Sequence, residues 1–163
     1  MSSPFTSQIN EGENVTVQAN ESREALASKA FLKLANAIFE LWTQKGSSDT
    51  RLLDHPWIPD ELVTVGESHS GKDRREHLVP RMAICVKAHD MFSTGRSVEE
   101  VAEFIRAHVK IVLISKEEQE RLDNKAHLDL RQKMPEGWTF ETGDVFARLT
   151  AAGVSYRLYD LPC

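Results

Sequence analysis

An acidic residue and a histidine stand side by side near the middle of the chain, in the segment Arg75-Glu76-His77-Leu78-Val79-Pro80. Further along, the apolar run at residues 109–114 is followed at once by the charged segment 116–123. A histidine titrates near neutral pH and can take a proton from water, as the general base of a hydrolysis does. These two segments are the part of the sequence that suggests chemistry.

The order of these pieces resembles the ββα-metal finger of the HNH endonucleases, over roughly residues 61–130. The resemblance implies two antiparallel strands and a helix that hold one divalent metal ion, either Mg²⁺ or a transition metal. It also implies a protein that hydrolyses DNA phosphodiester bonds, with the metal as a Lewis acid on the phosphate. Residues 78–108 separate the two strands, so the finger is expected to carry an inserted pair of helices.

The resemblance assigns the reacting groups residue by residue. His77 takes the place of the general base, and Glu76 takes that of a metal ligand. Gln119 falls where the family has an Asn or His ligand on the helix. Asp123 lies one turn later on the same helix face and is the second candidate ligand there.

The remaining assignments concern structure and substrate. Pro80 completes the acid-His-x-x-Pro pattern that follows the first strand, and His108 sits where the family often has a structural asparagine. Arg74, Arg75 and Arg81 are expected to position phosphates. Contacts of that kind give affinity without reading the base sequence.

The hydrophobic pattern predicts an α+β fold, in which a helical N-terminal half packs on a small antiparallel sheet with a ββα-metal-like element. Residues 1–20 are polar and are expected to form a flexible N-terminal arm. Residues 21–163 are expected to form a single globular domain. Apolar residues at three- and four-residue spacing predict a long helix that opens it, from about Ser22 to Lys45.

Two serines mark further helix starts. Ser97 and Ser115 are each followed three residues later by a glutamate, which is the pattern of a capping box. The run at residues 109–114 has strong β-propensity and suits a central strand. The helix after Ser115 is expected to continue toward Lys133.

Charge is distributed unevenly along the chain. The formal net charge is −5, which counts against strong nonspecific binding of nucleic acid. Residues 67–134, however, hold thirteen Lys or Arg against twelve Asp or Glu, whereas both flanking segments are acidic. The segment with the candidate site is therefore the least acidic part of the chain.

The sequence also bears on location. It contains no apolar run of the roughly 20 residues that a membrane-spanning helix needs. The N-terminus lacks the basic and apolar regions of a secretory signal. Cys85 and Cys163 do not form a disulfide framework, and no CxxC pair suggests a thiolate zinc site. We therefore expect a cytoplasmic protein with no membrane partner.

Two other functions fit the same sequence. The first is a non-catalytic interaction or inhibitor protein on a degenerate HNH-like scaffold, whose acidic surface binds a basic, nucleic-acid-handling protein. A positive cleft around His77 would favour the nuclease, and a continuous negative face would favour the inhibitor. The second is an oligomerising structural protein, which would expose a large apolar stripe around Phe31, Ile38 and Trp42.

Overall fold

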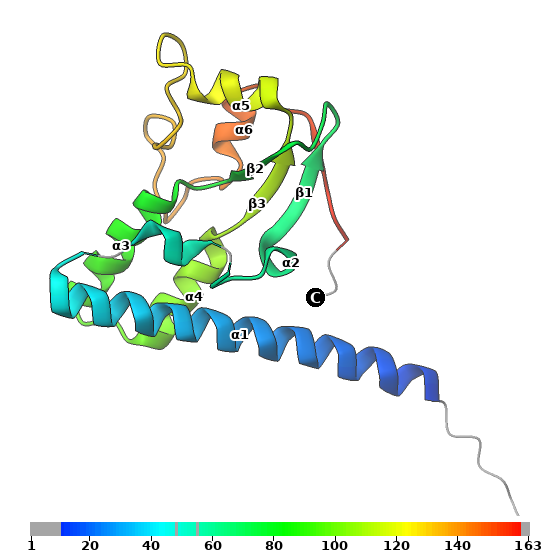
Figure 1. The fold of residues 1–163 in the computed structure, drawn as a ribbon, viewed down its shortest axis with the longest axis vertical. Helices are drawn as coiled ribbons and strands as arrows, with labels where there is room; N and C mark the ends of the chain where they lie inside the picture. The colour runs from blue at the N-terminus through cyan, green and yellow to red at the C-terminus, as the bar shows by residue number, and fades with distance from the viewer. Residues whose placement is uncertain (1–10, 48, 55, 161–163) are drawn as a thin grey trace, which may run out of the picture.

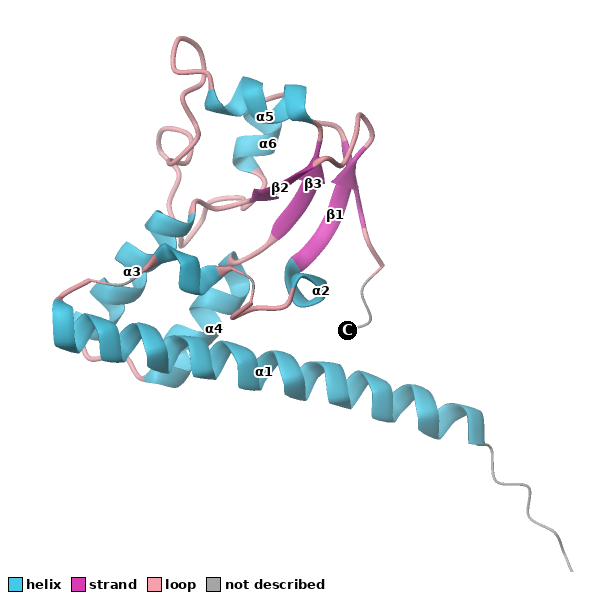
Figure 2. Cartoon of the chain, viewed as in Figure 1, coloured by secondary structure: helices cyan, strands magenta, loops and turns pink. Residues whose placement is uncertain are grey.

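The computed structural model describes residues 11–47, 49–54 and 56–160. Figure 1 and Figure 2 show how the helices and strands are arranged. In chain order they are α1 (Glu11–Lys45), a short 3₁₀ helix η1 (Thr50–Leu53), α2 (Asp60–Val63), β1 (Thr64–Ser68), β2 (Arg74–His77), α3 (Arg81–Ser93), α4 (Val98–His108), β3 (Ile111–Ile114), α5 (Lys116–Asp123), α6 (Ala147–Ala151) and β4 (Tyr156–Leu158). Within these residues no helix is long and apolar enough to cross a membrane.

The strands form a four-stranded sheet in the order β2-β3-β1-β4. β3 pairs antiparallel with β2 and parallel with β1, and β1 pairs antiparallel with β4. The α+β class with a helical N-terminal half is confirmed, but the expectation of a purely antiparallel sheet is wrong. The chain returns through α3 and α4 before β3 joins the sheet, and that long crossover allows β3 to run parallel to β1.

The sheet separates two apolar clusters. Successive side chains of a strand point to opposite faces. Accordingly Ile111 and Leu113 of β3 pack with the cluster formed largely by α1, α3 and α4, whereas Val112 and Ile114 pack with the cluster that includes Leu122 and Leu149. In Figure 1, α1 lies at one end of the molecule and α5 and α6 lie at the other.

Helix α1 begins earlier than the sequence indicated. It runs from Glu11, so Ser22 lies inside the helix and does not cap it. Residues 11–20, predicted as part of an arm, continue the helix, and residues 1–10 lie outside the described part of the chain. The predicted end at Lys45 is confirmed, because Gly46 adopts a φ of 68° there, which glycine tolerates best.

The ββα order expected from the sequence is present. β2 and β3 are antiparallel neighbours, with α3 and α4 inserted between them in the sequence, and α5 begins two residues after β3. α5 ends at Asp123 and does not continue toward Lys133. The side chain of Asn124 accepts a hydrogen bond from the backbone N–H of Ala126, a local turn that competes with continuation of the helix.

Both predicted capping boxes form, and the second fixes the start of α5. Ser115 Oγ accepts from the backbone N–H of Glu118 at 3.2 Å, and Glu118 Oε2 accepts from the backbone N–H of Ser115 at 2.8 Å. Ser68 Oγ also donates to Glu118 Oε1 at 2.7 Å, which ties the box to β1. Glu118 is thus fully engaged in positioning the helix.

We expect Ser115→Ala to lower the free energy of unfolding by about 1–2 kcal/mol, because Ser115 is only 3% exposed and the N–H of Glu118 would lose its acceptor away from water. Urea unfolding at neutral pH measures the change. Ser97→Ala is the matched control, since it removes the same bond from an exposed capping box. An equal loss in both variants would contradict the importance of burial at Ser115.

Candidate functional site

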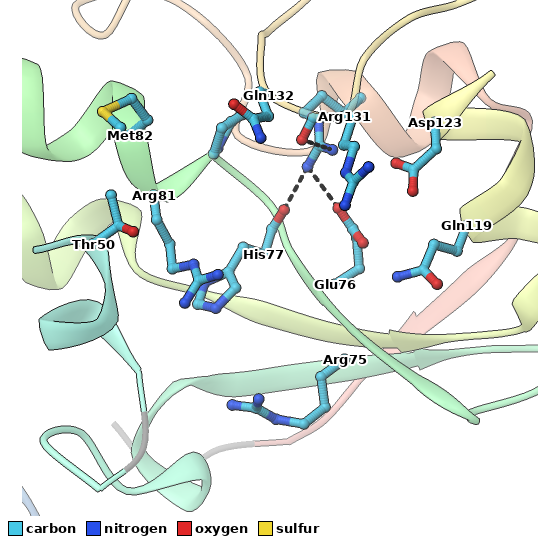
Figure 3. Close-up of a pocket in the computed structure, with 12 residues that line it drawn as sticks. Thr50, Arg75, Glu76, His77, Arg81, Met82, Gln119, Asp123, Arg131 and Gln132 are labelled. Carbon is cyan, nitrogen blue, oxygen red and sulfur yellow. Dashed lines mark hydrogen bonds and ion pairs between the residues drawn. The ribbon is translucent and has the colours of Figure 1, made fainter. Parts of the chain in front are cut away.

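A polar pocket with a volume of about 380 Å³ lies between β2, the start of α3, α5 and α6. Figure 3 shows the side chains that line it. They are Thr50, Arg75, Glu76, His77, Pro80, Arg81, Met82, Gln119, Asp123, Arg131, Gln132 and Arg148. The lining holds four arginines and two carboxylates. Asp54 and Asp60 form ion pairs with two of these arginines, so cationic and anionic groups nearly balance around His77.

The structure brings the three predicted metal ligands together. Glu76 comes from β2, and Gln119 and Asp123 come from α5, which packs on that strand. Figure 3 shows all three side chains on one side of the pocket. Burial raises the pKa of Glu76, the charge of Arg148 opposes that rise, and nearby Asp123 adds to it, while Gln119 donates a hydrogen bond to Glu76. The carboxylates are therefore close enough to act on one another.

Arg148 is the central residue that the sequence did not reveal. Its side chain is 1% exposed, and Nη1 lies 2.9 Å from Glu76 Oε1. The guanidinium also donates to three backbone carbonyls, from Nε to Leu130 at 2.8 Å, from Nη1 to His77 at 2.6 Å and from Nη2 to Arg131 at 3.3 Å. One buried cation thus joins α6 to β2 and to the segment after α5.

His77 is almost completely enclosed. Its side chain is 13% exposed, and within the described residues neither ring nitrogen has a hydrogen-bond partner. Nε2 lies 3.7 Å from Asp54 Oδ2, which is longer than a hydrogen bond. Burial lowers the pKa of His77 to about 4, and the charge of Asp54 only partly offsets this. The ring is therefore neutral at pH 7, but in this enclosed state it is a weaker base than the histidine of near-neutral pKa that the sequence suggested.

Two of the predicted phosphate-binding arginines line the pocket beside His77. Arg75 Nη2 lies 2.8 Å from Asp54 Oδ1 and 2.5 Å from Asp60 Oδ1. Arg81 Nη1 lies 3.1 Å from Asp54 Oδ2. Asp54 therefore holds both guanidiniums next to the histidine.

The other predicted residues are placed differently. Arg74 is exposed on β2, does not line the pocket, and donates to the carbonyl of Asp73. His108 also lies outside the pocket lining, at the end of α4. Its Nδ1 lies 2.7 Å from the carbonyl oxygen of Phe104, and its ring packs edge-on against Phe140. Pro80 lines the pocket and is the N-cap residue of α3.

The predicted metal ligands offer oxygen atoms, the kind of ligand that a hard cation such as Mg²⁺ takes. Within the described residues no cluster of three or more His, Cys, Asp or Glu side chains could hold a metal. Glu76 and Asp123 nevertheless supply two carboxylates, and Gln119 adds an amide on the same side of the pocket. Mg²⁺ is commonly held by one or two carboxylates, with waters and substrate phosphate completing its shell. Arg148 neutralises part of this charge and is expected to weaken binding.

Comparisons of the chain with protein-family models, with curated proteins and with solved structures found no match.

The buried neutral His77 should make the folded state sensitive to acid. Above pH 6.5 the histidine is neutral in both the folded and the unfolded chain. As the pH falls from 6.5 toward 4, the unfolded chain binds a proton that the folded chain does not. We expect a loss on the order of 3 kcal/mol across this window. Urea unfolding at several pH values, compared between the wild type and His77→Asn, isolates this contribution; parallel pH profiles would exclude it.

Removal of the Glu76 charge should destabilise the protein strongly. Glu76→Gln leaves Arg148 buried without its carboxylate, so we expect the free energy of unfolding to fall by about 3–5 kcal/mol. Asp123→Asn is the control, because it removes a carboxylate from the same pocket that makes no ion pair with Arg148 in the described structure. Chemical unfolding of both variants at pH 7 measures the difference, and a similar small loss in both would refute a structural role for the pair.

Proposed function

We propose that the chain is a metal-dependent endonuclease of the HNH type that hydrolyses DNA phosphodiester bonds. One observation carries the proposal: the pocket gathers His77, the carboxylates of Glu76 and Asp123, and several guanidiniums. These groups come from β2, α5 and the elements around them, in the ββα order that the resemblance implies. A neutral base beside cations and carboxylates is a combination suited to hydrolysis of an anionic ester.

Substrate binding in this scheme uses the arginines beside His77. Arg75 and Arg81 are the guanidiniums next to His77, and both are held by Asp54. A phosphate offers a stronger set of acceptor oxygens in the same region and competes with Asp54 for them. Binding is thus an exchange of one anion for another, which places the phosphorus beside the histidine.

The chemical step depends on the neutral ring of His77. A ring nitrogen takes a proton from a water molecule as the water oxygen attacks the phosphorus. The bond between the phosphorus and the leaving oxygen breaks, and the leaving oxygen takes up a proton from a solvent water. The ring nitrogens are shielded from solvent in this structure, so Arg81 or Asp54 must shift before water reaches them. The charge exchange that binds phosphate supplies that shift.

Glu76, Gln119 and Asp123 would hold the divalent ion. When bound, such an ion supplies Lewis-acid stabilisation of the negative charge that develops on the phosphate and the leaving oxygen. The protein contributes a wall of the site that is already fixed, since Arg148 holds Glu76 and the capping box at Ser115 holds α5.

A second candidate is a non-catalytic protein on this scaffold that binds a basic, nucleic-acid-handling partner. Its specific support is that several charged groups of the pocket already have protein partners. Asp54 binds Arg75 and Arg81, and Arg148 binds Glu76. The formal net charge of −5 also suits a basic partner better than a nucleic acid.

Plasmid cleavage distinguishes the two candidates. We expect the folded wild-type protein to nick plasmid DNA with Mg²⁺, Mn²⁺, Ni²⁺ or Zn²⁺. His77→Ala should reduce the rate by about 10²–10⁴-fold, the usual contribution of a general base. His69→Ala is the matched control, since that histidine contacts Ser155 and does not line the pocket. Absence of cleavage by a folded sample with every metal would favour the second candidate, and full activity of His77→Ala would remove the assigned base.

A further inference from the structure

A second concavity adjoins the candidate site. It has a volume of about 390 Å³ and is lined by Lys125, Asp129, Arg131, Gln132 and Lys133. Arg131 and Gln132 line both this concavity and the pocket around His77. Because these two residues are common to both linings, the two hollows share a wall. Figure 3 shows their side chains on the side of the pocket opposite Arg75.

The lining of the second concavity is cationic. Lys125, Arg131 and Lys133 face a single carboxylate, that of Asp129, which lies 2.9 Å from Lys133 Nζ. The surface therefore suits an anion.

The segment that forms this concavity is held in place by backbone hydrogen bonds. The carbonyl of Asn124 accepts from the N–H of Asp129 at 2.9 Å, and Leu130 N–H donates to the carbonyl of Leu122 at 2.8 Å. Arg148 then binds the carbonyl of Leu130. The same buried guanidinium that contacts Glu76 thus also fixes the position of the basic segment relative to the pocket.

We infer that the second concavity binds backbone phosphates that flank the cleaved bond of the DNA strand. The inference rests on the proposed function. A strand whose reactive phosphate lies beside His77 continues past Arg131 toward Lys125 and Lys133. The contacts are to phosphate, so they add affinity without sequence preference.

The inference is tested with the full-length protein and labelled DNA, in EDTA to prevent cleavage. Fluorescence anisotropy compares an oligonucleotide long enough to cover both concavities with a dinucleotide, at several salt concentrations. Lys125→Gln/Lys133→Gln should weaken oligonucleotide binding on the order of tenfold and reduce the slope of log K against log salt by about 1.4–1.8 for two lost contacts. Dinucleotide binding should not change.

The matched control is Lys29→Gln/Lys33→Gln, which removes the same charge from α1, outside both concavities. We expect the control to bind the oligonucleotide like the wild type. Asp129→Asn should change the oligonucleotide affinity in the opposite direction. It removes the one carboxylate of the lining, and asparagine tolerates the φ of 50° found at this position, so oligonucleotide affinity should rise.

The outcomes separate the two proposals. Equal losses in both lysine pairs would assign the effect to overall charge and overturn the inference. An unchanged affinity in Lys125→Gln/Lys133→Gln, with binding still lost in Arg81→Gln, would overturn the inference alone. Failure of the wild type to bind the oligonucleotide would overturn the inference, whereas the plasmid-cleavage assay with added metal decides the proposed function separately.

Discussion

The contact between Glu76 and Arg148 is the interaction on which the rest of this structure depends. A buried ion pair forms at a desolvation cost, and it persists where further hydrogen bonds satisfy both ions. Arg148 meets that condition, because three backbone carbonyls accept from it in addition to the carboxylate. Those carbonyls belong to β2 and to residues 130–131, so one side chain fixes the strand that carries the histidine and the segment that carries the basic concavity.

The ion pairs on the two sides of the pocket differ in how deeply they are buried. On the side of Glu76 the ion pair is buried, and exchange of partners would leave a charge uncompensated inside the protein. On the side of His77 the ion pairs of Asp54 with Arg75 and Arg81 are partly exposed, so they are weaker and can be replaced. An incoming anion is therefore directed to the side of the histidine.

Local signals in the sequence were sufficient for several elements of this fold. Ser97 and Ser115 reach only three residues along the chain, and the capping boxes predicted from them form. The β-branched run that became β3 lies inside the sheet as expected. The start of α1 was not predicted correctly, because the polar part of the helix that precedes its apolar stripe carries no hydrophobic signal. The parallel pairing of β3 was not predicted either, because strand pairing depends on contacts between residues that are distant in the sequence.

The difference between local signals and contacts between distant residues also explains why Arg148 was not predicted as part of the site. Glu76 and His77 are adjacent, and Gln119 and Asp123 are one helical turn apart, so their spacing was informative. Arg148 lies in the short helix α6 and contacts a strand residue 71 positions away in the sequence. An arginine at a position where a helix is otherwise buried needs a carboxylate or several carbonyls to compensate its charge. A charged residue on the apolar face of a helix is therefore a signal in its own right, and here it would have pointed to a buried acidic partner before any contact was known.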